Sequence, residues 1–297
     1  MSIQTPTTDP LFVQPEARRP AYATGMLLDA TDFSAEQTYH RGRLARALAF
    51  LCGGGTLAGL RVRHVPGTAT QAEEIQVEPG LAVDRLGRLV ELTRPACLRL
   101  PRWFSALAAD DITLASRDIL PGFVSQRLLD AAPPLPALAL IADVFLRFAA
   151  CEVGLAPSFA QGPFDALNAV ATANLRDAYE LRLVPRPGLD NAYSGLPLAL
   201  GGVDVASGNA TARRNALQDA VLVDGYGGQG RPGGSGGLGA VPELPLDFDR
   251  SAVFLARVFI PLSAGTPAAR SADLPLVDNW SRRILPPVAL LGQWAGL

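Results

Sequence analysis

The clearest periodic pattern in the chain lies in residues 31–55, where apolar positions recur every three or four residues. Ser34 followed by Gln37 is typical of a capping box, and Gly53 to Gly55 would end a helix. At 100° per residue, with Arg43 and Arg46 opposite, one face carries Phe33, His40, Leu44, Ala47, Leu48 and Leu51. The pattern predicts an amphipathic helix over residues 31–55 that packs along one side of a larger body.

From Thr56 onward the period changes to two, which is typical of strands with one buried face. Apolar and polar residues alternate in 60–63 and 75–78, and short apolar segments follow at 81–83 and 89–92. Between the last two, Asp84-Arg85-Leu86-Gly87-Arg88 has the composition of a hairpin loop. We predict a small antiparallel sheet over residues 56–100.

Residues 101–135 have the pattern of a helical insertion with two short helices, PRWFSALAAD and GFVSQRLLDA. The following segment, 136–150, fits two elements, because Asp143 and Arg147 would pair at i,i+4 on a helix but also share one face of a strand. We favour the strand. Alternation around Tyr179 and around Phe259 predicts two more strands, so a main β domain is expected over residues 136–265.

The rest of the chain is less regular. Pro10, Pro15 and Pro20 predict an extended N-terminal arm over residues 1–30, and residues 266–297 form a C-terminal extension. Residues 186–249 are mostly loop-forming apart from one helical candidate, ATARRNALQDAVL, and loops of this length are usually functional or ordered by a neighbour. We predict an α+β, β-rich fold in which the arm and the amphipathic helix pack on an antiparallel sheet or β-sandwich with long Gly/Pro-rich loops.

The composition narrows the function classes. With 297 residues, 48% of them apolar, the chain can bury a large core, and its net charge of −2 gives no nucleic-acid or membrane-surface signature. All 26 basic residues are arginine, which removes lysine-based chemistry. The first thirty residues lack a basic segment followed by an apolar one, and charged residues interrupt the apolar stretch after Leu135. We therefore expect synthesis in the cytoplasm without a signal peptide, and no membrane insertion.

Cysteines and histidines are few. Cys52, Cys97 and Cys151 are dispersed without a C-x-x-C, which predicts buried free thiols in a reducing compartment. His40 lies on the apolar helix face and His64 near the end of a strand, so both are interpreted as packed, hydrogen-bonded side chains. With so few soft ligands we expect no metal site and no cofactor.

The segment 225–239 contains two motif matches. Gly225, Gly227 and Gly230 spell G-x-G-x-x-G, and Ser235 lies at the centre of a G-x-S-x-G. A dinucleotide site requires a helix after the glycines, and a nucleophile elbow requires a later histidine, but the segment is followed by neither. Nine of its fifteen residues are glycine, so we interpret it as a loop and expect a neighbouring subunit to pack on it.

Carboxylates leave an alternative open, because a glycosidase needs only two of them across a cleft. A β-rich carbohydrate-binding or carbohydrate-cleaving module with a carboxylate pair therefore remains possible, with Trp103, Trp280 and Trp294 as stacking candidates. Sequence alone does not locate the pair. The adjacent Asp110 and Asp111 are interpreted as a solvated turn at a helix end.

The first hundred residues are more informative. The run GMLLDATDFSAEQTYHRGRLARALAFLCGGGTLAGLRV, followed by IQVEPGLAVDRLGRLVEL, resembles a family of uncharacterised proteins that accompany contractile phage tails and phage-tail-like injection systems. The resemblance is carried by a D-F-x-x-E-Q-x-Y helix, a G-L-x-V strand and a P-G-x-A-x-D-x-x-G-R hairpin, which here comprise Asp32, Phe33, Glu36, Gln37, Tyr39, Gly59, Leu60, Val62, Pro79, Gly80, Ala82, Asp84, Gly87 and Arg88. RDAYELRLVP and VFLARVFIPL look like later strands of the same family.

The resemblance implies a non-enzymatic structural protein of a baseplate, tail tip or fibre attachment, assembled into a virion tail or tail-like particle. The implied partners are other tail or baseplate subunits and copies of this chain, with no nucleic acid. Interface candidates lie in the arm, the Gly-rich loop and the C-terminus: Phe12, Tyr22, Met26, Tyr226, Gly227, Gly228, Gly230 and Trp294.

Overall fold

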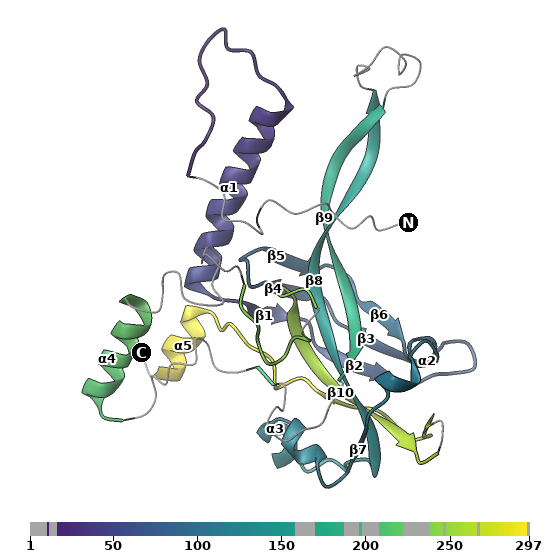
Figure 1. Cartoon of the computed structure of the whole chain (residues 1–297). Helices are drawn as coiled ribbons and strands as arrows, with labels where there is room; N and C mark the ends of the chain where they lie inside the picture. The colour runs from purple at the N-terminus through teal and green to yellow at the C-terminus, as the bar shows by residue number, and fades with distance from the viewer. Residues whose placement is uncertain are drawn as a thin grey trace.

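The computed structural model describes residues 11, 17–157, 170–186, 196–197, 208–222, 238–245, 248–265 and 268–295 (Figure 1). Within these residues strands dominate, every ladder between the strands is antiparallel, and the helices are few and mostly short. The predicted α+β, β-rich class is therefore confirmed.

The largest sheet has six strands and is built around one long strand. That strand, β8, is the segment that fitted either a helix or a strand in the sequence, so the strand prediction is confirmed. It pairs antiparallel with β10, β9 and β7, while β11 and β12 extend the sheet beside β10. The bounds are β7 (Leu114–Ser116), β8 (Leu138–Pro157), β9 (Val170–Pro185), β10 (Val253–Ser263), β11 (Ala269–Arg270) and β12 (Leu276–Asp278).

Residues 55–99 form two three-stranded sheets, where the pattern predicted one. The orders are β1-β4-β5 and β2-β3-β6. The chain leaves the first sheet at Gly59 and Leu60, whose φ angles are +62° and +55°, because two successive left-handed residues break the pleat. The bounds are β1 (Gly55–Gly59), β2 (Val62–Val65), β3 (Glu74–Val77), β4 (Gly80–Val83), β5 (Leu89–Leu92) and β6 (Ala96–Arg99).

The core lies on both faces of β8. On one face, alternate residues such as Val144 and Leu146 pack with Ile75 and Val90 of the two small sheets. On the other face, Phe145 joins a cluster with Leu244 and Phe254, and further along Ile141 packs with Phe123. Burial on both sides explains why β8 reads as a nearly continuous apolar run instead of an alternating strand.

The segment after β6 contains the two predicted helices, each shorter than expected: α2 (Leu100–Ser105) and α3 (Gln126–Asp130). Two short 3-10 turns, η2 (Ala109–Asp111) and η3 (Leu120–Phe123), and the strand β7 lie between them. The pattern did not predict β7, which is only three residues long. Trp103 of α2 donates from Nε1 to the Leu183 carbonyl oxygen at 2.7 Å and so fastens the insertion to β9.

Two further helices lie in the second half of the chain. The predicted ATARRNALQDAVL helix is confirmed as α4 (Ala210–Leu222), and α5 (Val288–Ala295) lies near the C-terminus. Between β12 and α5 the chain returns to β1: Thr56 N donates to the Arg283 oxygen at 2.9 Å, and Leu285 N donates to the Thr56 oxygen at 2.8 Å. Part of the expected C-terminal extension is thus integrated into the sheets.

The long helix α1 (Ala30–Leu51) corrects two expectations. Its N-cap is Asp29, which with Asp32 forms the capping box, so the Ser34/Gln37 cap was wrong. Only Ala45 and Ala49 are buried, so the helix does not pack along the body. Figure 1 shows α1 projecting from the body with its N-terminal end farthest from the sheets; the long ribbon of β8 and β9 also projects from the body. No helix in the described part of the chain is long and apolar enough to cross a membrane.

Candidate interaction surface

Only some of the predicted interface residues lie within the described part of the chain. Phe12, Tyr226, Gly227, Gly228 and Gly230 lie outside the described residues, as does the side chain of Trp294 on α5. Tyr22 and Met26 lie in the segment before α1 and have exposed fractions of 48% and 45%. The Tyr22 hydroxyl donates to Glu36 Oε2 at 2.6 Å, which ties this segment to the helix and raises the Tyr22 pKa.

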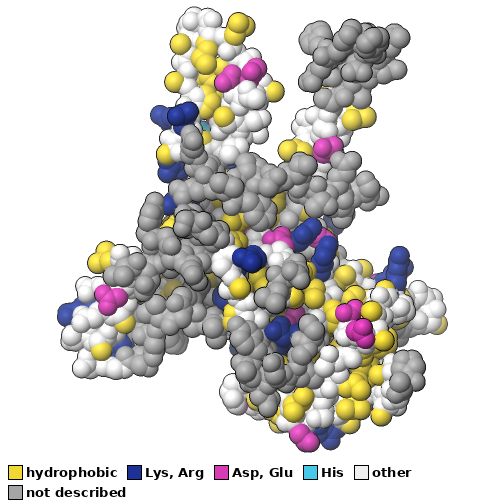
Figure 2. Space-filling model, viewed as in Figure 1, with side chains coloured by type: hydrophobic (Ala, Val, Ile, Leu, Met, Phe, Trp, Pro, Cys, Tyr) yellow, Lys and Arg dark blue, Asp and Glu magenta, His cyan; other side chains and the backbone are white. Residues whose placement is uncertain are grey.

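A line of exposed residues, most of them apolar, runs along one face of α1. We call it the α1 stripe and define it as Ala30, Phe33, Gln37, His40, Leu44, Ala47 and Leu51; each of the seven is exposed. Phe33, Leu44 and Leu51 have exposed fractions of 50%, 57% and 83%. Hydrophobic side chains are visible along the projecting helix in Figure 2. The sequence had grouped most of these residues on one face, but that face points to solvent.

A different face of α1 holds the helix to the body. Ala45 and Ala49 are its buried residues, and Ala45 lies against the β4–β5 hairpin turn. At that turn Gly87 has a φ of +87°, and a Cβ there would lie 1.7 Å from the Ala45 carbonyl oxygen. Only glycine permits this approach, so α1 is attached through its C-terminal third while its stripe stays exposed.

Charge divides α1 into two halves. Asp29, Asp32 and Glu36 lie at the N-terminal end, and Arg41, Arg43 and Arg46 lie in the C-terminal half. In Figure 2 the acidic side chains are toward the free end of the projecting helix and the arginines toward its base. Hydrogen bonds from Thr31 and from backbone N–H groups lower the Asp29 pKa, as an N-cap carboxylate requires.

The two histidines differ. His40 is exposed and lies 3.8 Å from Glu36, so the prediction of a packed histidine was wrong for it. The His64 side chain is only 8% exposed, with its Nε2 2.8 Å from Glu73 Oε1, so the prediction is confirmed there. Arg270 binds the same Glu73 carboxylate through both terminal nitrogens and, with His64, lowers its pKa.

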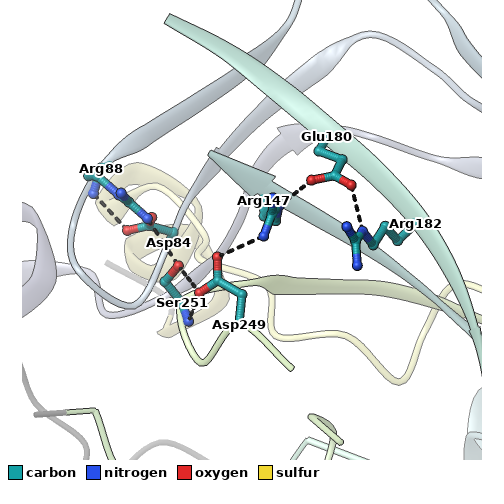
Figure 3. A network of polar contacts seen from close by, with 7 residues as sticks. All are labelled: Asp84, Arg88, Arg147, Glu180, Arg182, Asp249 and Ser251. Carbon is teal, nitrogen blue, oxygen red and sulfur yellow. Dashed lines mark hydrogen bonds and ion pairs between the residues drawn. The ribbon is translucent and has the colours of Figure 1, made fainter. Parts of the chain in front are cut away.

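The hairpin that receives α1 contains a polar network (Figure 3). Asp84 is fully buried and accepts from Arg88 Nε at 2.7 Å and from the N–H groups of Leu86 and Arg88 at 2.9 Å. Burial raises the Asp84 pKa, and these donors oppose the shift. Arg88 also donates to Ser251 Oγ at 3.0 Å, and Ser251 Oγ donates to Asp249 at 2.6 Å. The network joins the hairpin to the chain entering β10.

The network continues onto the base of the ribbon. Arg147 of β8 lies 3.7 Å from the second Asp249 oxygen and is hydrogen-bonded through Nε to Glu180 of β9. Arg182 Nε donates to the other Glu180 oxygen at 2.5 Å. Figure 3 shows these side chains bridging the two strands. The ribbon and the β4–β5 hairpin are therefore linked through one network of ion pairs and hydrogen bonds.

Two other carboxylates are buried in the large sheet. Asp143 accepts from Arg257 at 2.7 and 2.9 Å and from Arg186 at 2.8 Å. Asp278 accepts from the N–H and hydroxyl of Ser125 at 2.7 and 2.8 Å, from the Trp280 N–H and from the Ser281 hydroxyl. These carboxylates are engaged in structural contacts.

The C-terminal segment is fastened by an amide and a guanidinium. Asn279 pairs with the Val62 backbone, accepting from its N–H and donating to its carbonyl oxygen, both at 2.8 Å. Arg282 donates to the Leu60 carbonyl oxygen at 2.7 Å, and burial lowers its pKa to about 10. At the start of β2 the Asn279 side chain thus makes the two backbone hydrogen bonds that a neighbouring strand would otherwise make.

The remaining candidates give no assembled chemical site. Among the described residues no cluster of three or more His, Cys, Asp or Glu could hold a metal ion.

The cysteines are free as predicted, but Cys97 is exposed and Cys52 and Cys151 are half-buried, so their predicted burial was wrong. Asp110 and Asp111 form the exposed turn η2, as expected. Trp280 lies under Arg127, whose guanidinium carbon is 3.7 Å from the ring centroid.

Comparisons with known proteins give no family. Neither the protein-family models nor the curated proteins include a match to this chain.

Proposed function

We propose that this chain is a non-enzymatic structural subunit of a phage tail or phage-tail-like contractile injection machine, in its baseplate, tail tip or fibre attachment. The proposal joins the sequence resemblance with one observation: the residues that carry the resemblance have structural tasks around a projecting, uncovered helix. Asp32 caps α1, and Gln37 lies on the α1 stripe. Gly87 admits the helix, and Asp84 with Arg88 stabilises the hairpin beneath it.

The exposed surface supports an assembly role. Large apolar side chains exposed on one face of a projecting helix, here Phe33, Leu44 and Leu51, usually mark an interaction site. In the proposed particle, other tail or baseplate subunits or copies of this chain cover it, and the long ribbon of β8 and β9 offers a second projecting element (Figure 1). Neither feature requires a nucleic acid or a membrane.

The alternative is a carbohydrate-binding or carbohydrate-cleaving module, which would need an accessible carboxylate pair. The three fully buried aspartates in the described part of the chain, Asp84, Asp143 and Asp278, are held by arginine, serine or backbone donors. A catalytic pair would have to come from other positions. No observation favours this alternative, and binding to a glycan array is the measurement that would revive it.

The test is made on particles from the native source. We expect the chain to co-purify with tail-like particles, and we expect deletion of its gene to leave tails that are missing or incomplete in negative-stain images. The control is the same strain with the gene restored. The proposal would be contradicted if the deletion strain made normal particles and the chain were absent from every particle fraction of the wild-type strain.

A further inference from the structure

We propose that two copies of the chain associate through the α1 stripe, with their α1 helices antiparallel. The inference goes beyond the proposed function, because it names a second copy as one occupant of the projecting helix. It concerns the purified chain, so it can fail or succeed independently of any role in a tail.

The first observation is spacing. The stripe positions 30, 33, 37, 40, 44, 47 and 51 are separated alternately by three and four residues, which is the seam of a coiled coil. All seven are exposed, whereas Ala45 and Ala49, the two buried residues, lie on another face. A seam that is used inside one copy would be covered. Here it is open along the whole helix.

The second observation is charge, which selects the occupant. The N-terminal half of α1 is acidic and the C-terminal half is basic. Two α1 helices running parallel in register place like charges together, whereas an antiparallel pair places each acidic half beside a basic half. One helix is therefore complementary to a second copy of itself, as a two-fold symmetric interface requires.

The edge of the stripe makes the arrangement specific. Glu36 and Arg43 are seven residues apart and flank the stripe on the same side. When two helices are related by a two-fold axis across their seam, the same edge of each meets the other. With the axis near His40, Glu36 faces Arg43 of the partner subunit. The two-fold axis generates the same contact a second time, with the two chains exchanged. In a parallel pair this contact is absent.

The attachment of α1 agrees with this direction. The helix is held to the body near its C-terminal end, at Gly87, and its 22 residues span about 33 Å. An antiparallel pair places the two bodies at opposite ends of the paired helices. A parallel pair would bring both bodies to the same end.

Self-association is tested by sedimentation equilibrium of the purified chain over about 1–100 µM, a range suited to a small interface. We expect a monomer–dimer equilibrium, and we expect Leu44→Glu to weaken dimerisation at least about tenfold. The matched control is Ala35→Glu, at an exposed position of the same helix away from the stripe. Helical circular dichroism checks folding of both variants. A wild-type chain that stays monomeric, or a Leu44→Glu variant that dimerises normally, would overturn the proposal.

The direction is tested by cysteine cross-linking, with Cys52, Cys97 and Cys151 changed to serine. In the antiparallel pair position 40 meets itself and position 33 meets position 47. We expect His40→Cys to form a covalent dimer by itself. We expect Phe33→Cys and Ala47→Cys to cross-link only when the two variants are mixed. If each variant cross-links alone the helices are parallel, and if none does the stripe is not the interface; either result overturns the inference.

Discussion

At the residue scale, the most deeply buried ion pair of the large sheet joins two neighbouring strands. Asp143 and Arg257 are opposite each other in the β8–β10 register, and both are almost fully buried. Asp143 and Arg147, which suggested a helical pair in the sequence, bind different partners: Arg257 and Arg186 in one case, Glu180 and Asp249 in the other. Long-range pairing decided between two readings that local spacing left open.

We predict that Asp143→Asn lowers the free energy of unfolding by about 3–5 kcal/mol, because the buried Arg257 loses the charge that compensates it. Urea unfolding measures the change. Asp110→Asn in the exposed turn η2 is the control and should change stability by less than about 0.5 kcal/mol. If both substitutions changed the free energy of unfolding equally, the buried pair would contribute no more to stability than an exposed carboxylate.

We predict that Arg270→Gln changes the pH dependence of stability. Arg270 and His64 hold the folded-state pKa of Glu73 below its ordinary value of 4.5, so ionised Glu73 stabilises the fold above that pH. This contribution is lost as the pH falls through the lowered pKa. In urea titrations the stability gap between wild type and variant should therefore be widest near neutral pH and shrink as the pH falls below 4.5. A gap that widens in acid would contradict this sign.

At the element scale, α1 forms for local reasons but takes its position from a tertiary contact. Asp29 and Asp32 close its first turn, and the apolar spacing carries the helix to Leu51. Its place in the fold depends on Gly87, where the β4–β5 turn touches the Ala45 carbonyl. The face that contacts the body is lined by alanine, which hydrophobicity patterns rank below leucine and phenylalanine.

We predict that Gly87→Ala loosens the junction of α1 with the body, because the new Cβ meets the Ala45 carbonyl oxygen and the positive φ is strained. Amide hydrogen exchange in the C-terminal turns of α1 should become faster. Gly122→Ala is the control, since its Cβ would have open space. Unchanged protection of α1 in Gly87→Ala would show that the contact does not hold the helix.

At the scale of the whole molecule, segments far apart in sequence close the fold. Asn279 pairs with Val62, Arg282 reaches Leu60, and Ser251 meets Arg88. These contacts cross the predicted boundaries at 100, 135 and 265. The apolar core crosses them too, because β8 packs against the small sheets and against the residues around Phe123 and Leu244.

We predict that deleting residues 225–239 impairs assembly but leaves the fold intact. The segment lies almost entirely outside the described residues, and the expectation that a neighbouring subunit packs on it comes from its composition. Circular dichroism and thermal unfolding report on the fold, and negative-stain images report on particles. Normal particles from the deletion variant would refute the prediction.

The sequence alone determined the local elements. Strand alternation, the Gly87 turn, the α4 helix and the β-rich class could all be predicted, because each depends on residues close together in the chain. Tertiary structure decided the rest: that residues 55–99 split into two sheets, that β7 and β12 exist, and that α1 exposes its apolar face. An amphipathic pattern identifies the apolar face of a helix, but it does not show which element or chain packs against that face. For α1 the body covers an alanine face, which leaves the larger apolar side chains available to another chain.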